Sequence, residues 1–382
     1  MATKYHAVAA AVAAGLLLAA CSSSGGTSAT GHDASSGGAS SSGAASAALA
    51  AAKATYDQYV QIHSLESVPA LPSAPPKGKT VTILTCNIPT CATAAAGAKA
   101  AAEAVGWIPT VLQDDSTPQG YTSLMNQVAA NPPDALIYIP ALPDSSIQPQ
   151  LARLQAAGTK IVEESPLGDP LATDGPVKAV VLGQADGRLA GEVMGRAVDA
   201  DANGPTKAVF VWDPSFSAGW GPVKDGFTEA VESVGGSVGV LPITVQNIGK
   251  QAPSQIVSYL QAHPDTKYVA TPAVDYQAGL DPALQAAGLL GKVKVISRAT
   301  NQATLAAIKD GTDWAGVAIE LASGGWRGMD QAIRLVMGLP LGSRASQTGW
   351  EQIYVKSNVS QTASLPEPPN YEQIYKTAWH VS

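Results

Sequence analysis

Residues 80–113 begin with the β-branched run Thr-Val-Thr-Ile-Leu-Thr-Cys (80–86), continue with Thr-Ala-Ala-Ala-Gly-Ala-Lys-Ala-Ala-Ala-Glu-Ala-Val (93–105), and end with Ile-Pro-Thr-Val-Leu-Gln (108–113). β-Branched runs favour strands, and alanine-rich runs favour helices. The stretch therefore predicts a strand, a helix and a second strand. Short apolar strands separated by longer helices are typical of a parallel sheet that is covered on both faces.

The same alternation continues along the chain. We expect further strands at 135–139, 160–164, 177–182, 207–212, 238–243, 268–270 and 292–297, and helices at 121–130, 146–157, 187–200, 221–234, 254–263, 276–287 and 302–310. Roughly 300 residues follow Lys79, which is too many for one ordinary core. The pattern predicts an α/β protein with two doubly wound, parallel-sheet lobes.

The first twenty residues have the layout of a secretory signal peptide. Lys4 lies in a polar lead, residues 7–18 are apolar, and small residues precede Cys21. Leu18-Ala-Ala-Cys21 resembles the lipobox of bacterial lipoproteins, which implies that Cys21 becomes the lipidated first residue. The alternative is an uncleaved anchor, but the apolar run falls short of the ~20 residues that span a bilayer. We expect a protein held by lipid on the extracytoplasmic face of the cell membrane.

Two segments separate this anchor from the folded body. Residues 21–46 are rich in Ser, Gly and Ala, and we expect a flexible tether there because they bury little apolar surface. Residues 47–78 predict an alanine-rich helix followed by a stiff linker that contains Pro69, Pro72, Pro75 and Pro76.

The charge balance argues against nucleic acid as a partner. The chain has 23 basic and 30 acidic residues, and removal of Lys4 with the signal peptide leaves 22 against 30, or −8. Such an acidic chain without a basic stripe does not suit a phosphate backbone. The sequence also lacks Gly-x-Ser-x-Gly, Gly-x-x-x-x-Gly-Lys and His-Glu-x-x-His motifs. We therefore expect no catalytic residues, no cofactor and no metal.

Cys86 and Cys91 are the two cysteines that remain after Cys21. In an oxidising compartment they form a natural disulfide pair, and Pro89 between them favours the turn that a bridge needs. Free thiols are the first alternative. A metal site is the second, although no His or Cys cluster completes four ligands.

The order of many short segments resembles a known family. These segments include Ala104-Val-Gly-Trp107, Val111-Leu-Gln-Asp-Asp115, Asn131-Pro-Pro-Asp-Ala-Leu-Ile-Tyr-Ile-Pro140, Leu154-Gln-Ala-Ala-Gly-Thr-Lys-Ile-Val162 and Gln184-Ala-Asp-Gly-Arg-Leu-Ala-Gly191. Between about Lys79 and Gly338 the chain resembles type I periplasmic solute-binding proteins of the sugar-transport group, whose relatives bind ribose and galactose.

The resemblance implies two lobes joined by three crossing strands, with a ligand held in the cleft and closure by hinge motion. The crossings are expected near 182–183, near 319–320 and around 348–352. Lobe 1 would then comprise 79–182 plus 321–347, and lobe 2 would comprise 183–320 plus 348–382.

The resemblance also implies ligand-binding positions, at Asn87, Asp144 and Glu164 in the first lobe and at Asp213, Trp220, Asp275 and Arg298 in the second, with Glu320 near a hinge glutamine. For the carboxylates the alternative is a solvated loop end. Phe216 or Trp212 could replace Trp220 as an aromatic platform for a sugar face or a cation. Arg298 stands where the family usually has Asp, and the family's second-lobe arginine is missing.

From these features we expect a monomeric lipoprotein that captures a small polar solute, such as a sugar or polyol, for the permease subunits of an ABC importer. One alternative keeps the fold and binds a cationic or amide-bearing nutrient. The other is a ligand sensor that presents its surface to a membrane signalling receptor. An enzyme has no supporting motif.

Overall fold

The computed structural model describes residues 38–115, 117–166, 175–343, 348–361 and 366–382. The expected signal peptide, Cys21 and the first part of the expected tether lie outside the described residues. Residues Ser42–Ser382 form one compact unit, which contains every contact described below. Among the described residues, no helix combines the length and the apolar character that a membrane crossing requires.

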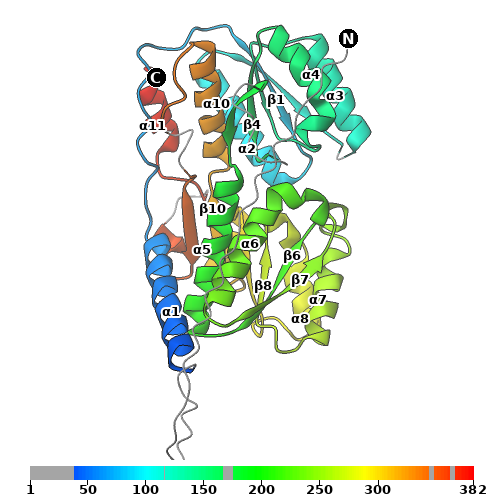
Figure 1. The fold of residues 1–382 in the computed structure, drawn as a ribbon, viewed down its shortest axis with the longest axis vertical. Coiled ribbons are helices and arrows are strands. Elements are labelled where there is room, and N and C mark those ends of the chain that lie inside the picture. The colour runs from blue at the N-terminus through cyan, green and yellow to red at the C-terminus, as the bar shows by residue number, and fades with distance from the viewer. Residues whose placement is uncertain (1–37, 116, 167–174, 344–347, 362–365) are drawn as a thin grey trace, which may run out of the picture. The chain divides into compact units, whose positions relative to one another are not determined.

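Lobe 1 is built on a parallel sheet in the order β2-β1-β3-β4-β5 (Figure 1). Its strands are β1 (Thr80–Thr85), β2 (Ile108–Gln113), β3 (Ala135–Tyr138), β4 (Lys160–Glu164) and β5 (Val177–Val181). Helices α2 (Pro89–Ala104) and α10 (Ala322–Val336) cover one face, and α3 (Pro118–Ala130) and α4 (Asp144–Ala156) cover the other.

The two faces of this sheet follow from the alternation of side chains along each strand. Ile83 and Ile137 pack with the alanines of α2, whereas Leu84 and Leu136 pack with Tyr121 and Met125 of α3. The strands therefore read as continuous apolar runs because both of their faces are buried.

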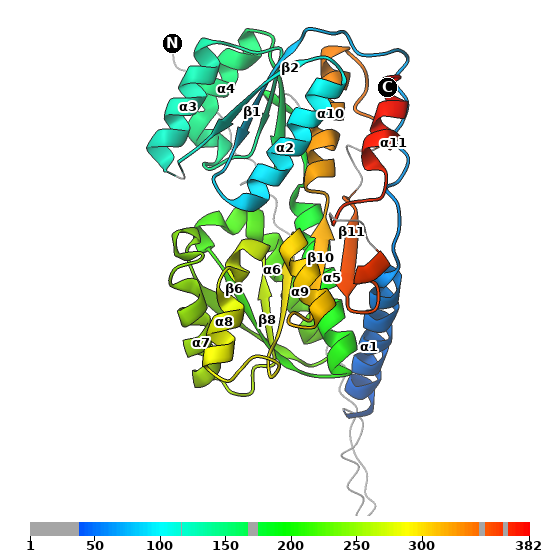
Figure 2. The same ribbon diagram turned by 180° about the vertical axis from the view of Figure 1, so that it is seen from behind.

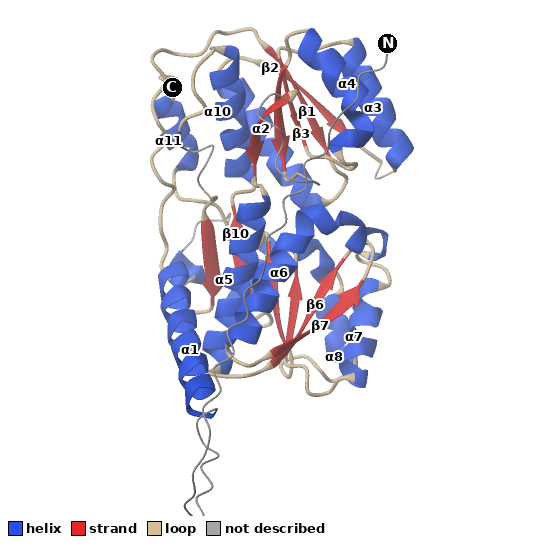
Figure 3. Ribbon diagram, in the orientation of Figure 1, coloured by secondary structure: helices blue, strands red, loops and turns tan. Residues whose placement is uncertain are grey.

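Lobe 2 has a sheet in the order β11-β10-β9-β8-β6-β7, in which only β10 and β11 pair antiparallel (Figure 3). Its strands are β6 (Lys207–Trp212), β7 (Ser237–Pro242), β8 (Tyr268–Thr271), β9 (Lys294–Arg298), β10 (Ala315–Ile319) and β11 (Glu351–Val355). Helices α5 (Gln184–Ala202) and α6 (Ser217–Ser233) cover one face, and α7 (Ala252–Ala262), α8 (Leu280–Ala286) and α9 (Gln302–Asp310) cover the other.

The chain passes between the lobes on one side of the molecule. It leaves β5 of lobe 1 across Leu182-Gly183 to enter α5, and it leaves β10 of lobe 2 across Glu320-Leu321 to enter α10. After α10 it returns to lobe 2 as β11.

The N-terminal helix is longer than the sequence pattern predicted. Helix α1 runs over Gly38–Val60, so the flexible tether expected over 21–46 is wrong for its last residues, and the helix expected from Ala47 begins at Gly38. Ala44 and Ala45 are strong helix formers, and they extend the helix despite Gly43. Tyr56 and Tyr59 of α1 pack against the core of lobe 2.

The C-terminal helix corrects the expected assignment of 348–382 to lobe 2. Helix α11 (Tyr371–Ala378) lies along α10 of lobe 1 (Figure 2). Trp379 stacks on Trp326 with ring centroids 5.3 Å apart, and its Nε1 donates to Oδ1 of Asp330 at 2.8 Å. Large aromatic side chains gain most by complete burial, and Trp326 of α10 provides the buried surface.

Two further differences concern helices. The helix expected at 276–287 is split into η3 (Val274–Gln277) and α8, because Gly279 adopts a left-handed conformation with φ +78°. The sequence pattern predicted no elements after residue 310, and only the resemblance indicated crossing strands near the end of β10 and the start of β11. Helices α10 and α11 were missed. Gly324, Gly325 and Gly328 weaken the helical signal of α10.

Candidate functional site

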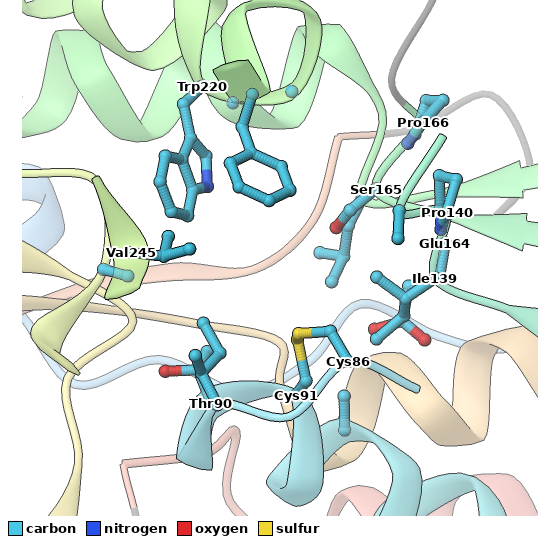
Figure 4. Close-up of a pocket in the computed structure, with 18 of the residues that line it drawn as sticks. Cys86, Thr90, Cys91, Ile139, Pro140, Glu164, Ser165, Pro166, Trp220 and Val245 are labelled. Atoms are coloured by element: carbon cyan, nitrogen blue, oxygen red, sulfur yellow. A yellow bond between two sulfur atoms is a disulfide. The ribbon is translucent and has the colours of Figure 1, made fainter. Parts of the chain in front are cut away.

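A cavity of about 140 Å³ lies where the carboxyl ends of the two sheets face each other (Figure 4). Every strand of lobe 1, and strands β6 to β10 of lobe 2, contribute lining residues at or just after their carboxyl ends. In open α/β sheets, ligands bind in the crevice outside the carboxyl ends of the strands, because the loops that follow the strands meet there. The volume suits a small solute rather than a peptide.

The loop after β1 forms the floor of the cavity. Cys86 and Cys91 are joined in a disulfide that closes the loop containing Asn87 and Ile88, and all four residues line the cavity. Thr85 Oγ1 donates to the carbonyl of Cys91 at 3.1 Å. The bridge and this hydrogen bond hold the loop in one conformation before any ligand arrives, which lowers the entropy lost on binding.

Glu164 and Arg298 bring charge to the cavity, one from each lobe. Both side chains are buried, at 3% and 8% exposed. Burial raises the pKa of Glu164 to about 7, while the Arg298 guanidinium opposes that shift. Burial lowers the pKa of Arg298, while Glu351, Asp186 and Glu164 act in the opposite direction. The Nε of Arg298 has no hydrogen-bond partner among the described residues.

A network of buried charges lies behind this pair, where the chain crosses between lobes. Arg327 Nη1 lies 3.4 Å from Oδ1 of Asp186 and 3.4 Å from Oε2 of Glu320. Glu351 is 2% exposed, and burial holds its pKa well above the usual range. This network connects α5, β10 and α10, so it fixes the segments that both lobes share.

Aromatic rings form the lobe 2 wall. The rings of Phe216 and Trp220 lie 5.2 Å apart, and Tyr276 meets Trp220 edge-on at 5.9 Å. Asp213 holds the wall together, because it accepts hydrogen bonds from the backbone N–H of Ser215 and of Val245, each at 2.9 Å.

One hydrogen bond joins the lobes directly beside the cavity. Thr90 Oγ1, in the first turn of α2, donates to Oδ2 of Asp275 in η3. Asp275 is 7% exposed, and burial raises its pKa while the bond from Thr90 opposes the shift. This contact exists only when the two lobes are close together.

Left-handed backbone conformations mark the ends of the strands that reach the cavity. Ser165, Leu182 and Ala299 have φ of 55°, 51° and 62°, and they follow Glu164, Val181 and Arg298 directly. Non-glycine residues adopt this region at a cost of roughly 1–2 kcal/mol each. Such strain persists only where the surrounding structure holds it, and it is common at ligand sites.

The structure brings Asn87, Glu164, Trp220 and Arg298 together in the lining of the cavity. The other expected ligand residues lie outside this lining and interact with neighbouring parts of the chain. Asp144 accepts from the hydroxyl of Tyr138 at 2.7 Å, Asp213 holds the aromatic wall, Asp275 is bonded to Thr90, and Glu320 lies near Arg327.

Sequence reasoning missed the apolar lining, which includes Ile139, Pro140, Leu182, Val245 and Leu321. Each of these residues lies just after the end of a strand, and this position could have indicated a place in the cavity. Their apolar side chains, however, look like those of core residues. The sequence analysis also did not single out Glu351, which belongs to the buried charge network behind the cavity. Among the described residues, no group of three or more His, Cys, Asp or Glu side chains is arranged to hold a metal.

A family model described as a periplasmic binding protein domain matches residues 81–340. The chain belongs to the periplasmic binding protein family. The two-lobed parallel-sheet architecture is that of the type I members, which confirms the resemblance and the fold class predicted from the sequence. No curated protein matches this binding protein.

Several solved structures share the fold. A glucose-galactose binding protein, GanP from Geobacillus stearothermophilus, is 18% identical with a TM-score of 0.64, over 74% of this chain and 99% of GanP. A sugar ABC transport substrate-binding protein from Bordetella parapertussis is 20% identical (TM-score 0.66), over 82% and 98% of the two chains. An ABC transporter solute-binding protein from Mycobacterium smegmatis, solved with glycerol bound, is 21% identical (TM-score 0.63), over 75% and 99%.

Proposed function

We propose that this protein captures a small solute of the sugar or polyol class in the cavity between its lobes and delivers it to the permease of an ABC importer. The observation that carries the proposal is the cavity itself, which is lined from both lobes at the carboxyl ends of two sheets. Structural neighbours solved with glycerol or allitol support the ligand class. The protein would bind and release its solute without catalysing a reaction.

Ligand binding and lobe closure are coupled in this proposal. A solute that touches both the Glu164 side and the Arg298 side of the cavity binds the closed arrangement better than the open one. It therefore shifts the population towards the closed state by its difference in affinity for the two. The permease would then distinguish the closed, loaded protein from the open one.

The proposed location follows from the N-terminal sequence. Lipid attached at Cys21 would hold the monomeric protein at the outer face of the cell membrane, with the residues up to α1 as the connection. Mass spectrometry of the membrane fraction tests this point, since a diacylated N-terminal peptide beginning at Cys21 is expected and an intact Met1 would contradict it.

Thermal unfolding of the mature chain against a broad panel of sugars, polyols, amino acids and amines tests the binding function. A ligand that binds only the folded state at 100 times its dissociation constant adds ~2.7 kcal/mol of stability. We expect a rise in the unfolding midpoint with a sugar or polyol. No rise across the whole panel would contradict the proposal.

A cavity-filling variant provides the matched control. Ala218 lines the cavity, whereas its neighbour Ser217 is exposed and does not. Ala218→Trp should abolish the ligand-induced shift, and Ser217→Trp should retain it. Equal shifts in both variants would place the binding site elsewhere on the molecule.

A further inference from the structure

Most polar side chains of the cavity are already engaged within the protein. Thr90 donates to Asp275, and the hydroxyl of Thr117 bonds both Asp115 and the backbone N–H of Gly120. Asn87, Asp114 and Gln184 each interact with other parts of the chain. Each of these groups therefore has at least one partner within the protein.

Arg298 lines the cavity with a buried Nε that lacks a hydrogen-bond partner among the described residues. A guanidinium carries five N–H donors and no acceptor. An unsatisfied buried donor is unfavourable, so a ligand oxygen that accepts from Arg298 would remove the penalty. A ligand ammonium has no acceptor and would leave it in place.

The charges around Arg298 argue against an anionic ligand. Carboxyl groups of Glu164, Asp186 and Glu351 all act on the guanidinium electrostatically. These interactions already favour the charge on Arg298, so an anionic ligand would gain less from this guanidinium than from an isolated one. A ligand with an uncharged oxygen that accepts from Arg298, and with a neighbouring hydroxyl that donates to Glu164, would satisfy both residues.

Most of the remaining wall is apolar. Figure 4 shows Trp220 and Val245 on one side of the cavity and Glu164 and Ile139 on the other, with the disulfide between them. Hydroxyl groups placed against such a surface lose their hydrogen bonds to water without replacement. A fully hydroxylated hexose carries hydroxyls around its whole ring edge and at C6, so a ring edge that meets this apolar surface loses hydrogen bonds to water.

We propose that the cavity selects an uncharged, partly deoxygenated, sugar-like ring, with one polar edge between Arg298 and Glu164 and an apolar side against Trp220 and the disulfide. This inference rests on the proposed binding function and specifies its ligand class. Arg298 donates to a ligand oxygen, and Glu164 accepts from a neighbouring ligand hydroxyl. Because the two residues belong to different lobes, the same edge contacts both lobes.

Calorimetric titration of the mature chain with matched pairs tests the ligand class. The probes are D-galactose and D-fucose, D-glucose and 6-deoxy-D-glucose, and L-mannose and L-rhamnose, together with D-galacturonate and D-galactosamine. We expect at least one 6-deoxy sugar to bind tenfold or more tightly than its parent, and both charged sugars to bind more weakly than D-galactose or D-fucose.

Equal or tighter binding of every parent sugar would overturn the inference, and so would preferred binding of either charged sugar. Absence of binding by all the ring probes would also overturn it. In that case the proposed function still stands if an acyclic polyol or another solute raises the unfolding midpoint, and it fails only if no solute does.

Variants of the two residues test their roles with the tightest probe. Arg298→Met should weaken binding a hundredfold or more, and Glu164→Gln about tenfold, whereas the control Arg188→Met, which removes an exposed partner of Glu229, should change nothing. The unfolding midpoint of each variant without ligand is measured as well, because Arg298 interacts with Glu164, Asp186 and Glu351 and its removal changes the stability of the fold. Wild-type affinity in both cavity variants would contradict the assignment.

Discussion

At the residue scale, the bond between Thr90 and Asp275 is the most direct link between the lobes beside the cavity. Their positions differ by 185 residues, and the bond forms only when α2 of lobe 1 approaches η3 of lobe 2. It therefore stabilises the closed arrangement without touching the ligand. A hydrogen bond to a charged group is typically worth ~1.5–3 kcal/mol.

Replacement of Thr90 by Val removes this hydroxyl while keeping the shape of the side chain. We expect ligand affinity to fall about tenfold, which corresponds to ~1.4 kcal/mol, because the closed state loses a bond that the open state lacks. Calorimetry with the ligand found in the thermal screen measures the change.

The control is Thr93→Val, since the Thr93 hydroxyl donates to the carbonyl of Pro89 within the same helix. Its affinity should stay at the wild-type value. An unchanged affinity in Thr90→Val would show that the Thr90–Asp275 bond does not contribute to closure.

At the element scale, each lobe contains a helix pair that packs backbone to backbone through glycine. A Cβ added at Gly97 of α2 would lie 2.1 Å from the carbonyl oxygen of Ala322 in α10. A Cβ added at Gly191 of α5 would lie 2.0 Å from the carbonyl oxygen of Val223 in α6. Neither backbone can move without shifting a whole helix. Because α2 also carries Thr90 and Cys91, this packing positions the cavity floor.

Substitution Gly97→Ala should destabilise the protein by about 1–3 kcal/mol, the usual cost of overpacking. Gly221→Ala in α6 is the matched control, because a Cβ added at Gly221 would have no atom within 4 Å. Alanine there should stabilise the fold by roughly 0.5–1 kcal/mol through helix propensity. Urea unfolding measures both, and a neutral Gly97→Ala would contradict the close packing of α2 and α10.

At the scale of the whole molecule, the interior holds many carboxyl groups. Burial raises the pKa of Glu163 to about 8 and the pKa values of Glu164, Asp199, Asp313 and Glu367 to about 7. In the unfolded chain these groups titrate near pH 4. Between pH 4 and pH 7–8 the folded state therefore binds more protons than the unfolded state, so the free energy of unfolding falls as pH rises through this window.

We expect the midpoint of thermal unfolding to be highest near pH 5 and to fall by several degrees towards pH 8. Asp199 is fully buried, and neither of its carboxylate oxygens has a hydrogen-bond partner among the described residues. Asp199→Asn should therefore make the pH profile flatter. A midpoint that is constant or rises between pH 5 and pH 8 would contradict this explanation.

Much of the α/β body followed from local sequence. The limits expected for β4 and α9 coincide with those of the structure, and the two-lobed α/β class is confirmed. The resemblance placed Glu164 and Arg298 among the expected ligand residues, and the structure puts both in the cavity lining, at the ends of β4 and β9. The local pattern missed glycine-rich α10 and the antiparallel strand β11, since neither has the local pattern of its neighbours.

The sequence by itself determined the alternation of strands and helices, because side-chain periodicity and helix propensity act over a few residues. Only the tertiary structure decided that α11 packs on lobe 1 and that Asp275 bonds Thr90 rather than lining the cavity. It also decided that the Nε of Arg298 is buried at the cavity without a hydrogen-bond partner among the described residues. These outcomes depend on contacts between residues far apart in the chain, and no local pattern encodes which distant surface a buried side chain meets.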